Sequence, residues 1–391
     1  MQLTNLDQPQ EQSACQKTVE PVPKWIQGLA HEAGVTFGGS DPWDVRVSDP
    51  RLYQRIARQG TLGFGEGFVD GQWECDAPDE LICRLLRAGT DSRMSVLFRA
   101  YLTARKVRDR LLNRQAKSRA FQVGEQHYDA GNDIFAAMLD DTMTYSCGYW
   151  RTASDLQQAQ LDKFDLICRK LQLRPGEKLL DIGCGWGGLA HYAAVNYGVS
   201  VVGITVSERQ HLIAQQRCEG LDVEIKLQDY RELVDTFDKV VSVGMFEHVG
   251  PKNYANYFDM VSRLLTSDGL FLLHSIGIDR YTDSVDPWIE KWIFPNGRLP
   301  SAIELTQSLD RRFLIEDWHN FGQDYDKTLM AWWHNFNRAW PDLAPSYNER
   351  FYRMWKLYLL GCAGFFRSRQ GQLWQLVLSK PTRSAQYLSV R

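Results

Sequence analysis

The sequence predicts an α/β protein with a Rossmann-like parallel sheet, preceded by a small, mainly helical N-terminal domain. Two observations predict this class. Beyond residue 120, five apolar runs of strand length alternate with segments of helical pattern, at 177–183, 199–207, 222–229, 237–246 and 269–278. Such alternation indicates a parallel sheet covered by helices on both faces. A glycine-rich turn directly follows the first run, where open α/β sheets bind their ligands.

The chain divides into three parts. Residues 1–92 are expected to form the small domain, which contains the glycine-punctuated aromatic stretch TLGFGEGFVDGQWEC and then a helical pattern. Residues 93–120 hold nine Lys or Arg against one Asp, so this segment carries +8 in a chain whose net charge is -3. Its apolar residues recur every three or four positions, which predicts a basic amphipathic helix. Residues 121–391 are expected to form the α/β catalytic domain.

The basic segment has two interpretations. A basic amphipathic helix is typical of an element that lies on an anionic membrane surface. It can equally be a solvated linker that packs its apolar face on its own protein.

Two late apolar runs, 313–322 and 373–381, are expected to complete a seven-stranded sheet as edge strands. No run approaches the roughly 20 apolar residues that cross a bilayer, and the N-terminus lacks the pattern of a secretory signal. The eight cysteines form no CxxC pair, which favours reduced thiols in a cytoplasmic protein over a disulfide frame or metal site. The near-neutral net charge gives no reason to expect a nucleic-acid partner.

The sharpest motif is LLDIGCGWGG, in which a strand pattern runs into four glycines and then a helical pattern. Glycines let the backbone turn tightly and approach a ligand at the helix N-terminus. A dinucleotide fold would place an acid at the end of the second strand, but that strand ends with Thr205 and Ser207. Asp181 instead precedes the glycines, and this DxGxGxG pattern is typical of class I S-adenosylmethionine-dependent methyltransferases.

Further motifs surround that loop: HYDAGNDIF, YSCGYW, VVGITVSERQ, VGMFEHVGPKNY, FLLHSIG, IFPNGRLPS, DWHNFGQDYDKTL and GCAGFFR. Together they closely resemble the bacterial cyclopropane-fatty-acyl-phospholipid synthases and, more distantly, the mycolic acid cyclopropane synthases. The N-terminal DGQWECD and LRAG resemble the phospholipid-active branch, in which a small domain precedes the catalytic one.

The resemblance implies transfer of a methylene equivalent from S-adenosylmethionine to the cis double bond of a phospholipid acyl chain. It also implies a homodimer and reversible, peripheral attachment to the inner face of the cytoplasmic membrane, where anionic lipids would attract the basic segment. The residues carried over for the cofactor are Tyr145, Ser146, Asp181, Gly183, Cys184, Gly185, Gly187, Gly188, Thr205, Gln210, Asp229, Tyr230 and Arg231.

The resemblance further implies a bound bicarbonate ion that takes the proton released on ring closure. Its expected holders are Cys147, Glu247, His274, the backbone of Ile276, and Tyr325. Glu247 and His274 follow or end neighbouring strand patterns, so both are expected at one edge of the sheet. A direct alternative makes Glu247 the base without bicarbonate. A structural hydrogen-bond pair is the third interpretation.

Three smaller predictions concern neighbouring residues. Cys362 is either catalytic or, as its apolar flanks favour, part of a helix that lines an acyl pocket. His248 is expected to point away from Glu247 if the strand pleat persists, which makes it structural. Six aromatic side chains in motif stretches either stabilise a cation or belong to the core. They are Tyr145, Tyr149, Trp150, Phe246, Trp318 and Tyr325.

Two other functions remain possible on the sequence. A methyltransferase of the same fold could act on a small amine, and the substrate-side motifs speak against it. A lipid-binding protein without activity could keep the fold, but it would have no need of Cys147, Glu247, His274 and Tyr325 together with the intact glycine loop.

Overall fold

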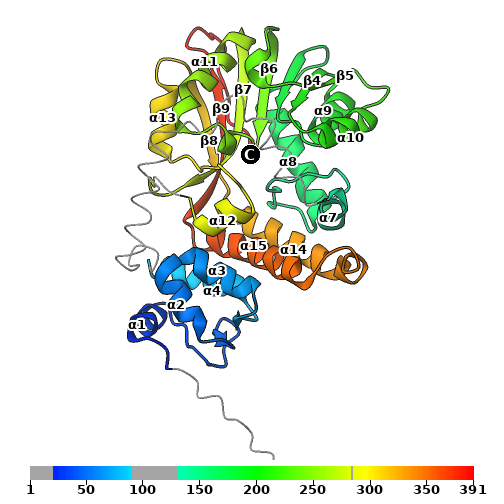
Figure 1. Ribbon diagram of the computed structural model, residues 1–391. Helices are drawn as coiled ribbons and strands as arrows, with labels where there is room; N and C mark the ends of the chain where they lie inside the picture. The colour runs from blue at the N-terminus through cyan, green and yellow to red at the C-terminus, as the bar shows by residue number, and fades with distance from the viewer. Residues whose placement is uncertain (1–20, 90–130, 283–284) are drawn as a thin grey trace, which may run out of the picture.

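The computed structural model describes residues 21–89, 131–282 and 285–391. A seven-stranded sheet with flanking helices forms the upper part of the molecule in Figure 1, and the N-terminal helices lie at the bottom, beneath two long helices, α14 and α15. The large sheet comprises β3 (Lys178–Ile182), β4 (Ser200–Thr205), β5 (Val223–Leu227), β6 (Phe237–Val243), β7 (Leu265–Ile278), β8 (Leu314–Asn320) and β9 (Gly371–Ser379).

The sheet confirms the predicted class and number of strands. Its order is β5-β4-β3-β6-β7-β9-β8, and the first five strands run parallel to one another. One prediction was wrong: β9 is not an edge strand, because it lies between β7 and β8 and pairs antiparallel with both. Only β8 forms that edge, and the C-terminal strand is therefore buried on both sides.

Side chains alternate between the two faces of this sheet, as the strand period requires. Leu180, Val240 and Phe271 face one apolar cluster, while Val241 and Leu272 on the adjacent positions face another. Both faces are covered, which explains why the central strands read as continuous apolar runs. The covering helices are α8 (Leu156–Lys170), α9 (Gly188–Tyr197), α10 (Glu208–Arg217), α11 (Tyr254–Leu264) and α13 (Ala302–Leu309).

The lower part of the molecule is helical. Two small strands pair antiparallel there, and the third and fourth helices of the chain lie against α15. Its elements are α1 (Lys24–Glu32), β1 (Arg46–Val47), α2 (Arg51–Gln59), α3 (Thr61–Val69), β2 (Trp73–Glu74) and α4 (Pro78–Arg87). The helices between it and the sheet are α7 (Asn132–Met138), α12 (Pro287–Trp292), α14 (Gln323–Leu343) and α15 (Glu349–Arg367).

The N-terminal helices pack tightly against α12 and α15. A Cβ atom on Gly65 would lie 2.4 Å from the indole of Trp288, so only glycine admits this close approach. Arg353 of α15 donates to the carbonyl of Phe68 at 2.6 Å and to the carboxylate of Glu74 at 2.5 Å. The helices that support the active site therefore rest on the N-terminal segment.

The predicted basic helix at 93–120 lies outside the described residues, so its structure stays a prediction, as do the three domain boundaries. Among the residues that the structure describes, no helix is both long and apolar enough to cross a bilayer.

Candidate active site

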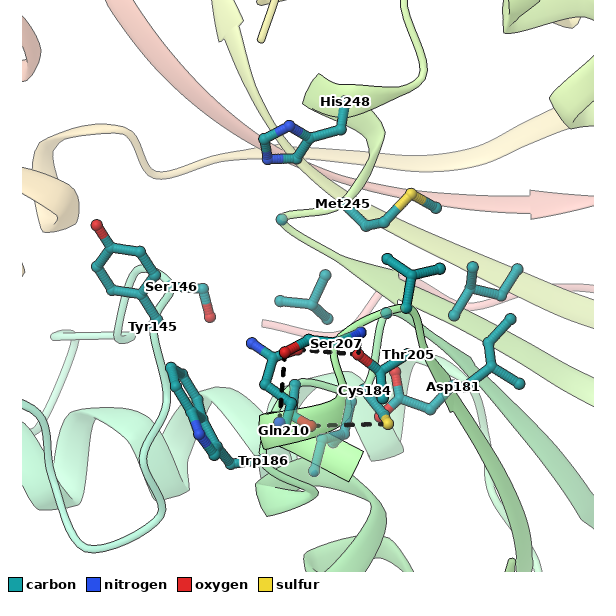
Figure 2. A pocket seen from close by; sticks show the side chains of 18 of the residues that line it. Tyr145, Ser146, Asp181, Cys184, Trp186, Thr205, Ser207, Gln210, Met245 and His248 are labelled. Atoms are coloured by element: carbon teal, nitrogen blue, oxygen red, sulfur yellow. Dashed lines mark hydrogen bonds between the residues drawn. The ribbon is translucent and has the colours of Figure 1, made fainter. Parts of the chain in front are cut away.

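The glycine loop connects β3 to α9 at the carboxyl edge of the sheet. Gly183, Gly185 and Gly187 have φ angles of 81°, 56° and 82°, a region that residues with a side chain rarely adopt. The loop carries its backbone around a pocket, which Figure 2 shows from close by. The predicted strand–loop–helix unit is thus present with the boundaries that the sequence indicated.

Twelve of the thirteen residues predicted to hold the cofactor line this pocket. They are Tyr145, Ser146, Asp181, Gly183, Cys184, Gly185, Gly188, Thr205, Gln210, Asp229, Tyr230 and Arg231. Gly187 is the exception. A Cβ atom at this position would lie 3.1 Å from the Cβ atom of Ala214 in α10, so Gly187 serves the packing of two helices and does not face the pocket.

The far side of the pocket is built from the ends of β4 and β5. The Thr205 hydroxyl donates to Gln210 Oε1 at 2.9 Å (Figure 2). Asp229 accepts hydrogen bonds from the backbone and side chain of Arg231, at 2.9 Å and 2.8 Å. The Arg231 guanidinium lies 5.2 Å from the centre of the Tyr230 ring, and burial raises the pKa of Tyr230 to about 12. This side offers hydroxyl, amide and aromatic groups, which suit a ribose and a flat base.

The floor of the pocket holds two buried ionisable groups, Asp181 and Lys163, and the sequence analysis missed Lys163. Lys163 of α8 is fully buried and donates to Ser146 Oγ and Gln160 Oε1, both at 2.7 Å. Burial lowers the pKa of Lys163 to about 7 and raises that of Asp181 to about 7, while the attraction between the two groups opposes both shifts.

Glu247 lies immediately beyond β6, in a short 3-10 helix, η4 (Phe246–His248). Its Oε1 accepts the backbone N–H of Ile276 at 2.7 Å. Its Oε2 is buried and has no hydrogen-bond partner among the described residues. Burial raises the pKa of Glu247 to about 7, although the Ile276 N–H opposes this shift.

The expectation for His248 depended on a persistent strand pleat, and that condition is not met, because the chain leaves the strand conformation before Glu247. In η4 Glu247 is buried and His248 is partly buried, and His248 contributes to the pocket lining (Figure 2). Burial lowers the pKa of His248 to about 4, so its ring is neutral.

His274 lies on β7, opposite Val243 of β6, as the strand-end argument predicted. Its Nδ1 lies 3.3 Å from Nε2 of Gln375 on β9, and its buried Nε2 has no hydrogen-bond partner among the described residues. Burial holds the pKa of His274 well below its usual value, and the nearby ammonium groups of Lys163 and Lys170 act in the same direction. The imidazole is therefore neutral and can donate one hydrogen bond.

The remaining catalytic candidates come from more distant parts of the chain. Burial holds the pKa of the Tyr325 hydroxyl well above its usual value, and the groups that act with burial are Cys147, Tyr145, Glu247 and Cys362. These side chains therefore surround one another. The thiols are not poised as nucleophiles, because burial raises the pKa of Cys362 to about 12 and that of Cys147 strongly as well.

The six catalytic candidates are not among the residues that line the cofactor pocket, and they are called the second group below. Of the aromatic candidates, Tyr145 lines the pocket and Tyr325 lies in that second group. Of the other four, Tyr149 and Phe246 are buried, whereas Trp150 and Trp318 are partly buried. Trp150 donates to Thr328 at 2.8 Å, and Trp318 packs edge-on against Trp374 at 5.3 Å.

Comparison with known proteins places this site in a family. Residues 115–376 match the family model described as mycolic acid cyclopropane synthetase. The chain belongs to this family. It is 54% identical over 352 residues to the cyclopropane-fatty-acyl-phospholipid synthase of Escherichia coli strain K12, with 90% of this chain and 92% of that protein covered. The protein is therefore an enzyme of the cyclopropane synthase family.

Solved structures of cyclopropane synthases share the fold. The cyclopropane synthase MmaA2 of Mycobacterium tuberculosis is 31% identical, with a TM-score of 0.63, and covers 66% of this chain and 98% of its own. Mycolic acid cyclopropane synthase CmaA1, in complex with SAH and CTAB, is 34% identical, with a TM-score of 0.62 and the same coverage. The class I S-adenosylmethionine-dependent methyltransferase fold is thus confirmed, and about a third of this chain has no counterpart in those two proteins.

The pocket suits the cofactor of such a cyclopropane synthase. Asp181 Oδ2 is buried without a hydrogen-bond partner among the described residues and can accept from an ammonium group. A side chain on Gly185 would project into open space, so the loop backbone is accessible to a ligand. When bound, S-adenosylmethionine supplies an electrophilic methyl group.

Sequence reasoning missed several residues of this cyclopropane synthase site. Trp186, His248, Asn296 and Lys163 line the pocket, and Gln160 accepts a hydrogen bond from Lys163. One signal was available for the last two: positions 160, 163, 164 and 167 share one helix face with the apolar stripe of α8. A lysine on a core-facing stripe indicates a buried, paired charge.

Proposed function

We propose that this enzyme transfers a methylene group from S-adenosylmethionine to the cis double bond of unsaturated acyl chains in membrane phospholipids. The products are cyclopropane acyl chains and S-adenosylhomocysteine. The proposal follows the family and the phospholipid synthase of E. coli that the chain resembles over most of its length. Bicarbonate, when bound, supplies the base that takes the proton lost on ring closure.

One observation carries this proposal. Glu247 Oε2 and His274 Nε2 are both buried without hydrogen-bond partners among the described residues, at the carboxyl edge of two neighbouring strands. Buried polar groups are nearly always paired in native proteins, and each unpaired one calls for an explanation. A small polar guest that both accepts and donates hydrogen bonds would satisfy the two atoms together, and bicarbonate has one hydroxyl and two acceptor oxygens.

The roles of the residues follow from their protonation. Neutral His274 and Tyr325 donate to the anion, since both remain uncharged far from their usual pKa values. Ionised Glu247 accepts from its hydroxyl and so orients it. Cys147 is a neutral thiol beside Thr328, whose hydroxyl lies 3.8 Å from the sulfur, and it contributes packing and a weak donor. The backbone N–H of Ile276 donates to the Glu247 carboxylate in this structure. Ile276 therefore acts on the anion indirectly, by orienting that carboxylate.

The acyl chain requires a water-free surface, because water would trap the carbocation as an alcohol. Cys362 lies on α15 among apolar residues such as Leu359 and Ala363, which are fully buried. On this basis Cys362 lines the acyl pocket. The Tyr358 hydroxyl contacts that of Tyr145, so α15 also joins the pocket to the cofactor loop.

The bilayer-embedded double bond requires the enzyme to dock on a membrane. We assign this to the basic segment at 93–120, with anionic lipids and the inner face of the cytoplasmic membrane as its target, each basic residue contributing about 1 kcal/mol. The residues at 1–92 act as a small docking or dimer domain, residues 121–391 form the catalytic domain, and the protein works as a homodimer.

The test is a mass spectrum of phospholipid fatty acids. Vesicles with cis-monounsaturated chains are incubated with the protein and S-adenosylmethionine, with and without bicarbonate. A gain of one CH2 with loss of the double bond is expected, and it should diminish when bicarbonate is removed. Persistence without bicarbonate would make Glu247 the direct base. Cofactor binding without any lipid product would favour methylation of a small amine.

A further inference from the structure

The buried ammonium group of Lys163 is the least explained charge near the cofactor pocket. Its side chain is fully buried, it lines the pocket, and it comes from α8, outside the glycine loop and the strand ends. An ammonium group has three donors. Two of them go to Ser146 Oγ and Gln160 Oε1, each at 2.7 Å, which leaves one donor for another acceptor.

Ser146 becomes a directed donor through this contact. Its oxygen accepts from Lys163, so its own hydrogen must point toward a different acceptor. No acceptor for that hydrogen is found in the part of the chain that the structure describes. Gln160 fixes the arrangement, because its Nε2 donates to the carbonyl of Ser146 at 2.8 Å and to that of Thr144 at 3.3 Å. The 144–146 segment is thereby held against α8.

The two carboxylates that attract Lys163 differ in their surroundings. Asp140 is satisfied by its own loop, since it accepts from the backbone N–H groups of Thr142 and Thr144 at 3.0 Å and 3.1 Å. Asp181 has a buried Oδ2 without such a partner. The pocket floor thus presents an acceptor at Asp181 and two directed donors at Lys163 and Ser146. This pattern is complementary to a zwitterion that carries an ammonium and a carboxylate group.

We propose that Lys163 is a further cofactor-binding residue, which together with Ser146 binds the α-carboxylate of the methionine end of S-adenosylmethionine. This inference rests on the proposed use of that cofactor. A buried cation is retained only where it is paired, and a carboxylate guest completes the pairing. Lys163 would then select ligands that keep the amino-acid end.

Two ligands separate this role from a structural one. S-adenosylhomocysteine has the amino-acid end, whereas 5′-methylthioadenosine has the same adenosine and thioether but lacks that end. Lys163→Met is expected to lower the affinity for S-adenosylhomocysteine about tenfold or more in isothermal titration calorimetry. This is the usual effect of losing a hydrogen bond to a charged group. The affinity of this variant for 5′-methylthioadenosine should change less than about twofold.

Lys170→Met is the matched control. Lys170 is also fully buried in α8, but it pairs with Asp317 at 3.1 Å and does not line the pocket. Lys170→Met should leave the ratio of the affinities for S-adenosylhomocysteine and 5′-methylthioadenosine unchanged. If Lys163→Met lowers the affinity for both ligands equally, or for neither ligand, the inference is wrong. Should that variant fail to fold, Ser146→Ala is measured, with the same selective loss expected and equal losses contradicting the idea. Failure of the wild type to bind S-adenosylhomocysteine would instead overturn the proposed function.

Discussion

Replacing Glu247 by Gln is expected to raise the stability of the protein at neutral and alkaline pH while abolishing ring formation. Burial raises the pKa of this carboxyl group from 4.5 to about 7. Each tenfold change in proton affinity is worth about 1.4 kcal/mol, so the ionised carboxylate costs the folded state about 3 kcal/mol. The glutamine keeps an Oε1 acceptor for the Ile276 N–H and carries no charge.

The pH dependence follows from the sign of this shift. The folded pKa lies above the unfolded one, so the folded state binds more protons between pH 4.5 and about 7. Wild-type stability therefore falls as pH rises through this interval, and the full penalty is present above it. With an unfolding entropy of about 2.1 cal/mol/K per residue over 391 residues, about 3 kcal/mol corresponds to a Tm higher by about 4 °C.

The assay is thermal unfolding by calorimetry near the two ends of that interval, with product formation measured in parallel. Glu247→Gln should unfold at a higher temperature than the wild type on the alkaline side, and the difference should vanish on the acidic side. Glu304→Gln is the control, because Glu304 pairs with Arg298 at 2.7 Å and its substitution should give no gain. A lower Tm for Glu247→Gln at alkaline pH, or retained cyclopropane formation, would refute the reasoning.

The remaining predictions concern packing and charge. An alkylating reagent should leave Cys147 unmodified at neutral pH in the folded protein and modify it in urea, because burial holds the pKa of Cys147 well above the usual value. Rapid labelling of Cys147 in the folded protein, measured by peptide mass spectrometry, would contradict this. Gly187→Ala should lower the free energy of unfolding by about 1–2 kcal/mol, because the φ angle of Gly187 is 82°. The affinity for S-adenosylhomocysteine, measured by calorimetry, should not change, because Gly187 faces Ala214. Asp317→Asn should cost about 3 kcal/mol in urea titration because it leaves Lys170 buried without its counter-ion; an unchanged midpoint would show that the pair contributes nothing.

Much of the site could be predicted because its signals are local in the chain. The glycine loop follows a strand and opens a helix within about ten residues, and the strand ends that carry Thr205 and Glu247 are recognisable as the ends of apolar runs. Parallel strands bring their carboxyl ends to one edge. The cofactor candidates themselves came from the family resemblance, and twelve of the thirteen line one pocket at this edge.

The errors and omissions arose where a residue's role depends on distant packing. Gly187 belongs to the same glycine loop as Gly185, but it packs against Ala214 of α10 and does not line the pocket. The pleat on which the expectation for His248 depended does not persist, because the strand gives way to η4 before Glu247. The position of β9 between β7 and β8 depends on pairing between residues about a hundred positions apart, which no local pattern encodes.

The sequence by itself determined the fold class and the cofactor loop, because hydrophobic periodicity and glycine placement act over a few neighbouring residues. The resemblance of its motifs indicated the family. Tertiary structure alone decided which polar groups are buried and which of them lack partners. The desolvation that brings the pKa values of Lys163, Asp181 and Glu247 to about 7 comes from surrounding atoms contributed by many elements. The chemistry of this site therefore depends on long-range packing around residues that the local sequence had only partly identified.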